Sequence, residues 1–149
     1  MNPNTRGLNS AWWALRIGLG VGPFLAGLDK FFNILTDWGM YLSPIAEELL
    51  PMSATAFMRT VGVVEMLVGL AILTRWTRLG GYVAAGWLVA IAANLVTTGM
   101  FLDLAVRDVE IALAAYTLAR LTEARQTADA TSPVPMPEAV GLRGPRTAA

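Results

Sequence analysis

The residues of this sequence that could carry chemistry are charged and amide side chains inside apolar segments. Such groups are costly in a membrane, and they mark ligand sites, proton relays or paired charges. They recur at helical spacing, so each segment presents its polar groups on one face. The candidates for ligand binding or proton relay are Glu65, Glu110, Arg59, Arg107, Asn94 and Lys30. The candidates for structural polar pairing are Arg16, Asp103 and Asp108.

Glu65 is the central candidate because it is expected near the middle of its helix, too deep for its carboxylate to reach water. It must therefore be paired, protonated or facing a cavity. The sequence favours Arg16 as its partner, with Arg59 as the rival. In a functional site, Glu65 and Glu110 would donate or accept protons. Arg59 and Arg107 would hold an anionic group.

These groups also have a purely structural interpretation. Four charged residues are expected near a membrane interface, where their side chains could simply reach water: Lys30, Arg59, Arg107 and Asp108. Asp103 and Arg107 are four residues apart on one helix and could neutralise each other. Asn94 could serve as an interhelical hydrogen-bonding residue. Function and helix packing therefore both remain open for this polar set.

The composition excludes several classes of chemistry. The 149 residues include no Cys and no His, so the chain has no disulfide, no thiol chemistry and no ordinary haem, zinc or iron–sulfur ligand. No metal site and no intrinsic cofactor are predicted. An electron-transfer group would have to be a diffusible quinone or belong to another subunit. Lys plus Arg and Asp plus Glu both number 11, and without a basic patch nucleic-acid binding is excluded.

Four apolar segments must position these groups. They cover about residues 11–31, 57–74, 79–101 and 104–121, in a chain that is 55% hydrophobic. Each is long enough to cross the roughly 30 Å hydrocarbon core as a helix. Backbone groups in lipid must be satisfied internally, which favours helices. The sequence predicts an all-α fold, a four-transmembrane-helix bundle within residues 1–121, with the lipid bilayer as its first partner.

Charge asymmetry predicts the orientation of this bundle. The short connection between the second and third segments carries Arg75 and Arg78, whereas the connection between the first and second carries Asp37, Glu47 and Glu48. Positive charge is retained on the cytoplasmic side. We therefore expect a multi-pass protein of the cell membrane with both termini in the cytoplasm and the acidic connection outside.

The external connection and the C-terminal tail are expected to differ in order. Apolar residues between positions 38 and 50 are spaced to give an amphipathic helix, bounded by Pro44 and Pro51, on the membrane surface or over the mouth of the bundle. Residues 122–149 are rich in Ala, Thr, Pro and Arg, with few large apolar residues. They are expected to form a disordered cytoplasmic tail.

Several short motifs resemble those of the DoxX/DoxD-like integral membrane protein family. They are RIGLG at 16–20, GLDKFF at 27–32, DWGMYLSP at 37–44, VGVVEMLVG at 61–69, NL at 94–95, FLDLAVRD at 101–108 and LARL at 118–121. The resemblance covers about residues 14–121. It implies likeness to the small membrane subunit of a thiosulfate:quinone oxidoreductase and to subunits of complexes for oxidative-stress resistance.

Three functions follow as hypotheses. The leading one is a DoxX-like membrane subunit that supports redox chemistry by binding quinone or by anchoring a partner oxidoreductase. The second is a small proton-coupled transporter working as a homo-oligomer, because convergent intramembrane carboxylates also describe a proton relay. The third is a lipid-binding or scaffold protein whose polar residues only hold helices together. Without a redox centre of its own, the chain is not expected to be an enzyme by itself.

Overall fold

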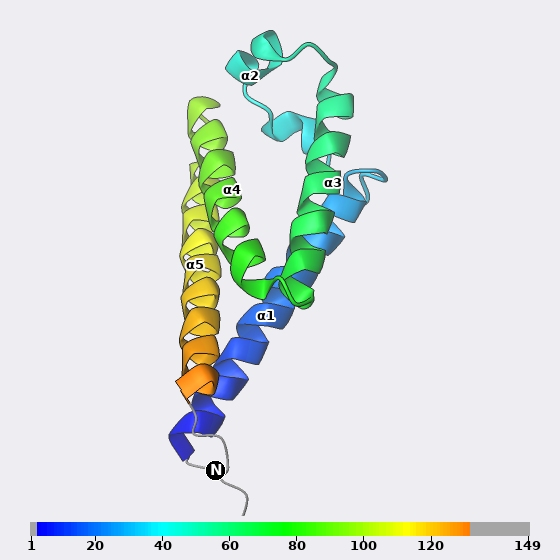
Figure 1. Ribbon diagram of the computed structural model, residues 1–149. Helices are drawn as coiled ribbons and strands as arrows, with labels where there is room; N and C mark the ends of the chain where they lie inside the picture. Colours follow the sequence, from blue (N-terminus) through cyan, green and yellow to red (C-terminus); the bar gives the residue numbers. More distant parts are fainter. Residues whose placement is uncertain (1–2, 132–149) are drawn as a thin grey trace, which may run out of the picture.

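A computed structural model describes residues 3–131 of the chain, and this part is all-α, as the sequence predicts. The helices are α1 (Pro3–Asp29), α2 (Pro44–Leu49), α3 (Ala54–Leu73), α4 (Thr77–Thr97) and α5 (Leu102–Thr131). A 3-10 helix, η1, covers Trp38–Tyr41 between α1 and α2. The long helices form two pairs, which diverge from the α3–α4 turn while α2 lies over the open end (Figure 1).

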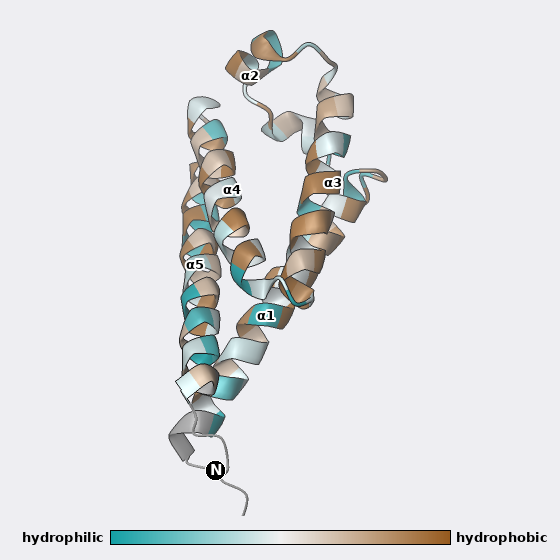
Figure 2. Ribbon diagram, in the orientation of Figure 1, coloured by the Kyte–Doolittle hydropathy of each residue, from teal (hydrophilic) through white to brown (hydrophobic). Residues whose placement is uncertain are grey.

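Three of the described helices are long and apolar enough to cross a membrane. They are α1 over Arg6–Asp29, α3 over Ala54–Leu73 and α4 over Thr77–Thr97. Hydrophobic residues predominate along these three helices, whereas the C-terminal part of α5 is more hydrophilic (Figure 2). α5 falls outside this group because charged residues recur along it, beginning with Asp103 and Arg107. The chain therefore has the helices of a membrane protein.

Glycines set the distance between α1 and α3. A Cβ added to Gly69 would lie 2.5 Å from the carbonyl oxygen of Gly20, and one added to Gly62 would lie 2.5 Å from that of Gly27. Both helices therefore carry glycines seven residues apart, and the two glycine pairs meet in antiparallel register. Small residues allow this backbone approach. The crossing fixes which side chains of α1 can reach α3.

Arg16 closes the C-terminal end of α3. Its Nε donates to the carbonyl oxygen of Ile72 at 3.0 Å, and its Nη2 donates to those of Leu73 and Thr74 at 2.7 and 2.6 Å. The last carbonyls of a helix lack intrahelical partners and carry partial negative charge, so a guanidinium is a favourable cap. The hydroxyl of Thr77 adds a 2.8 Å bond to the Ile72 carbonyl oxygen. These contacts hold the α3–α4 turn.

The connection after α1 contains two short helices rather than one amphipathic helix. Pro44 lies inside the first turn of α2, and Ser43 is its N-cap, accepting from the backbone N–H of Ala46 at 3.1 Å. α2 begins at Pro44, as the sequence predicts, because proline fits the first helical turn, where its missing N–H is no loss. The helix ends at Leu49, just before Pro51.

The predicted end of the last helix was also wrong. α5 continues to Thr131, so residues 122–131 are helical rather than disordered. Contacts with α1 stabilise this extension: the Trp12 indole donates to the Thr122 hydroxyl at 2.8 Å, and Arg125 donates to Asn9 at 2.8 Å. The first helix likewise begins at Pro3, before the apolar segment. The remainder of the predicted tail, 132–149, lies outside the described residues.

Candidate functional site

A cavity of about 740 Å³ lies between the two helix pairs and the segment that contains η1 and α2. Its size is within the usual range for small-molecule sites. Most of its wall is apolar, formed by residues such as Leu19, Val61, Val68, Ala84, Leu88 and Ile111. The polar or amphipathic residues in its wall are Lys30, Thr36, Trp38, Tyr41, Glu65, Trp87, Asn94, Arg107 and Asp108.

A buried ion pair stands in this wall. Lys30 Nζ lies 2.6 Å from Glu65 Oε2, and the two side chains are 4% and 10% exposed. The ring of Trp38 covers the ammonium, with its centroid 3.7 Å from Lys30 Nζ. Two of the sequence candidates are therefore brought together at the cavity, and Lys30 is buried there rather than exposed.

The predicted partner of Glu65 was wrong: it is Lys30, and not Arg16 or Arg59. Arg16 binds the carbonyl oxygen of Leu73, which is eight residues beyond Glu65 and roughly 12 Å further along α3. A Cβ on Gly62 would lie 3.1 Å from Lys30 Cβ. Lys30 therefore passes α3 where that helix has no side chain, and it reaches Glu65 one turn further on.

Asp29 connects the ion pair to the following segment. Its carboxylate accepts from the backbone N–H groups of Ile34 and Leu35 at 3.1 and 3.0 Å, and from the Trp38 indole at 2.9 Å. The last bond holds the Trp38 ring over Lys30. The sequence analysis assigned Asp29 no role, although its place directly before Lys30 at the end of an apolar helix was a usable signal.

Asn94 holds the opposite side of the same segment. Its Nδ2 donates to the Tyr41 carbonyl oxygen at 2.7 Å, and its Oδ1 accepts from the backbone N–H of Ser43 at 3.2 Å. The Tyr41 ring packs edge-on against Phe101, with centroids 4.9 Å apart. Both polar atoms of the amide are thus used to hold backbone, and the segment is fixed across one end of the cavity.

On α5, Asp108 is the buried carboxylate, with the residue 6% exposed. It lies within electrostatic range of both Lys30 and Glu65. Its neighbour Arg107 approaches it to 3.3 Å while 58% of the arginine side chain stays exposed. The predicted Asp103–Arg107 pairing was wrong, because Arg107 instead turns to the adjacent carboxylate.

Besides Arg16, which caps α3, three sequence candidates do not join the site. Arg59, Asp103 and Glu110 are exposed, and none of them lines the cavity. The prediction therefore assigned the wrong face of α5 to the interior, because the helix is rotated about its own axis relative to that prediction. That helix packs on α4 through alanines, among them Ala115 and Ala119, which lie against Gly81 of α4. This places Asp108 inward and turns Glu110 away.

Trp87 is a site residue that the sequence analysis missed. It lines the cavity from α4. Its indole Nε1 is buried without a hydrogen-bond partner within the described part of the chain. An unpaired buried donor costs roughly 1–3 kcal/mol, so such a group calls for an explanation. A bound acceptor would supply one.

The arrangement can hold an amphipathic molecule. Charged and hydrogen-bonding groups gather towards the end covered by the segment after α1, and the wall near the α3–α4 turn is apolar. Comparison of the chain with protein-family models, curated proteins and solved structures finds no match. The site's own chemistry must therefore carry the functional argument.

Proposed function

We propose that this chain is a DoxX-like membrane subunit that binds a quinone-class molecule in the cavity and so supports the redox chemistry of a partner oxidoreductase. The observation that carries the proposal is the buried Lys30–Glu65 pair in the wall of an otherwise apolar cavity. A charged pair is a costly way to line an apolar space and is often no more stabilising than apolar packing. Binding of a polar head group would explain why the cavity wall contains this charged pair.

The hydrogen-bonding groups of the cavity fit a carbonyl-bearing ring. An ammonium has three N–H donors, and Glu65 engages Lys30 through one of them. Among the described residues, the phenol of Tyr41 has only a long 3.4 Å contact, with the Thr36 hydroxyl. The Trp87 indole finds no acceptor among them. Three donors of different types are thus available to carbonyl oxygens.

The apolar wall fits the rest of such a molecule. Gly18, Gly22 and Ala26 follow one another at helical spacing along α1 and leave a wall without bulky side chains. Val68 and Ala84 continue the apolar lining towards the α3–α4 turn. A hydrocarbon tail would be held there by van der Waals contacts, because the surrounding lipid is as apolar as this wall. A head group at Lys30 and a tail towards Ala84 use the whole cavity.

The two buried carboxylates give this site a means to hold protons. When bound, a quinone supplies the electron- and proton-accepting group that a chain without Cys and His lacks. Glu65 and Asp108 are 8% and 6% exposed, and both line the cavity. In our proposal, Lys30 orients the head group while these carboxylates hold or release protons beside it. Electrons come from the partner oxidoreductase.

The proposal includes four membrane crossings, with α5 as the fourth. α5 packs along α4 and exposes apolar residues such as Val109 and Leu113 on its outer side. Its buried charge, Asp108, faces the cavity rather than lipid. Trp13 and Trp76 are exposed near the α3–α4 turn, where they would sit at the cytoplasmic interface.

This orientation predicts a labelling pattern. A single Cys introduced by Glu48→Cys should react with a membrane-impermeant thiol reagent in intact cells, because α2 would face outward. A single Cys introduced by Ala124→Cys should react only after the cells are opened. Both parent residues are exposed, so access is limited by the membrane alone. Labelling of Ala124→Cys in intact cells would overturn the orientation.

The proposed ligand can be sought in the purified protein. Extraction in mild detergent should yield protein that retains quinone in near-stoichiometric amount, together with an oxidoreductase partner. Quinone content is measured by chromatography of the solvent extract. Phospholipid phosphorus from the same sample corrects for quinone carried over in residual lipid. Quinone no higher than this carry-over, with no partner retained, would contradict the proposal.

A further inference from the structure

A second pocket, of about 210 Å³, lies at the end of the molecule away from the buried ion pair. It is formed where the N-terminal half of α1, the α3–α4 turn and the C-terminal part of α5 meet. Its lining is Trp12, Arg16, Thr74, Arg75, Thr77, Thr122, Arg125 and Gln126. Three arginines thus face one small polar space, and none of the lining residues that the structure describes is acidic.

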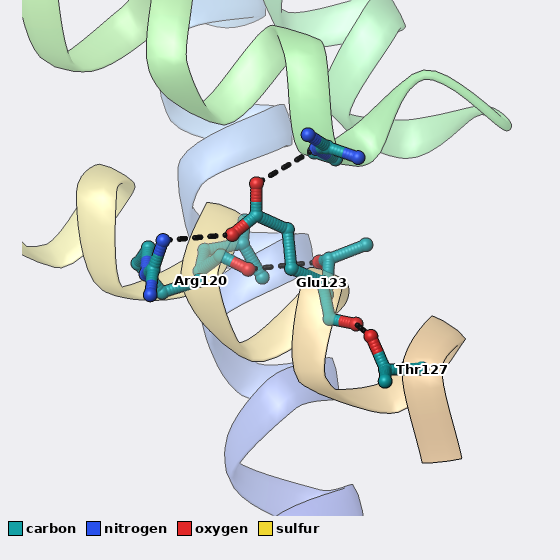
Figure 3. Close-up of polar contacts among 6 residues, drawn as sticks. Arg120, Glu123 and Thr127 are labelled. Atoms are coloured by element: carbon teal, nitrogen blue, oxygen red, sulfur yellow. Dashed lines mark hydrogen bonds and ion pairs between the residues drawn. The ribbon is translucent and has the colours of Figure 1, made fainter. Parts of the chain in front are cut away.

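No acidic side chain that the structure describes compensates the charges of these arginines. Arg16, Arg75 and Arg125 form no ion pair within the described part of the chain. The neighbouring cations differ: Glu123 accepts from Arg120 at 3.0 Å and from Arg78 at 2.9 Å. Figure 3 shows Glu123 occupied in this way, beside Arg120 and Thr127. Glu123 is therefore paired with arginines other than the three that line the pocket.

Two of the arginines converge on the same indole. The guanidinium carbons of Arg16 and Arg125 lie 4.8 and 4.5 Å from the centre of the Trp12 ring. The indole N–H is directed to Thr122, which keeps the ring in place. Like charges gathered at one ring repel each other, and a bound anion removes that repulsion.

Donors remain available for such an anion. Arg16 uses Nε and Nη2 on the end of α3, which leaves both N–H groups of Nη1. Arg125 donates through Nη1 to Asn9 and forms no second side-chain hydrogen bond with a residue whose side chain is described. Arg75 donates no side-chain hydrogen bond in the described part; its guanidinium carbon lies 5.5 Å from the Trp76 ring. Guanidinium groups match phosphate oxygens in geometry and charge.

We propose that this pocket binds the phosphate of an anionic phospholipid head group. The exposed Trp13 and Trp76 beside it are residues that favour the membrane interface, and basic pockets between helices there bind anionic head groups. Free phosphate has the same binding chemistry, so the test must separate the two sources. The site joins α1, the α3–α4 turn and α5, and its occupancy ties the two helix pairs together.

The test is thermal unfolding of the detergent-purified chain with three probes. Micelles containing phosphatidylglycerol should raise the unfolding temperature by several degrees, because a ligand that binds only the folded state stabilises it. Phosphatidylcholine should not, and inorganic phosphate alone should have little effect. A rise with inorganic phosphate equal to that with phosphatidylglycerol would overturn the lipid assignment. No rise with any probe, or an equal rise with both lipids, would overturn the site itself.

Two variants assign the effect to the pocket. Arg75→Gln should lose most of the shift caused by phosphatidylglycerol, since Arg75 has no structural hydrogen bond whose loss could unfold the chain. Arg78→Gln, three residues further on but paired with Glu123, should keep it. The shift is compared within each variant, so a change in basal stability does not matter. Equal shifts in the two variants would contradict the proposal.

Discussion

Glu65→Ala is expected to destabilise the protein by about 3–5 kcal/mol, the cost of removing one partner of a buried ion pair. The substitution leaves the Lys30 ammonium, on a side chain 4% exposed, with the Trp38 ring as its remaining close contact. Glu65→Gln should cost less because the amide oxygen can still accept a hydrogen bond. The free energy of unfolding in detergent measures both.

The matched control for this prediction is Glu110→Ala. Glu110 is an exposed carboxylate of α5 that forms no ion pair with a described residue, so its loss should cost at most about 0.5 kcal/mol. Replacing both partners, as Lys30→Met with Glu65→Leu, should recover much of the stability, since apolar pairs of similar volume often substitute for buried ions. If Glu65→Ala lowered the free energy of unfolding no more than Glu110→Ala does, the Lys30–Glu65 pair would not stabilise the fold.

Gly62→Ala should separate α1 from α3. The added Cβ would lie 2.5 Å from the Gly27 carbonyl oxygen and 3.1 Å from Lys30 Cβ, and a backbone oxygen cannot turn aside as a flexible side chain can. Overpacking of this kind typically costs about 1–3 kcal/mol. It should also weaken the Lys30–Glu65 contact, which depends on the same crossing. Unfolding measurements in detergent test the first effect.

Gly86→Ala provides the comparison on α4. A Cβ at Gly86 would meet nothing within 4 Å, so the helix gains the roughly 0.5–1 kcal/mol by which alanine exceeds glycine. Both substitutions replace Gly by Ala, but they should change the free energy of unfolding in opposite directions. A Gly62→Ala protein as stable as the parent would show that the helices can shift at that crossing without cost.

The faces of α1 and α3 could be predicted from the sequence because helical periodicity is a local property. Gly27 and Lys30 share one face, and Gly62 and Glu65 share another, as the spacing indicates. Which cation meets Glu65 could not be predicted in this way. It depends on the register in which the two helices cross, and that register follows from glycine contacts between distant parts of the chain.

For α5 the local pattern was ambiguous. One helical face carries Asp103, Arg107 and Glu110, and another carries Ala105, Asp108 and a run of further alanines. The prediction followed the charges. Packing against α4 follows the small side chains instead, because they allow close approach. Asp29 could have been selected as a candidate from its place beside Lys30, but its hydrogen-bond partners and those of Asn94 could not be predicted, since they lie on a long, irregular connection.

The most direct test of the proposed quinone site is a titration of the purified chain with a short-tailed quinone. Tryptophan fluorescence is the signal that monitors binding. Trp38 and Trp87 line the cavity, so binding should quench them saturably. Ala26→Phe, which fills the cavity from α1, should weaken binding at least about tenfold, equivalent to roughly 1.4 kcal/mol. Ala14→Phe, on an exposed position of the same helix, should leave it unchanged. Equal quenching in the parent and both variants, or full displacement of the quinone by a fatty acid, would contradict the account.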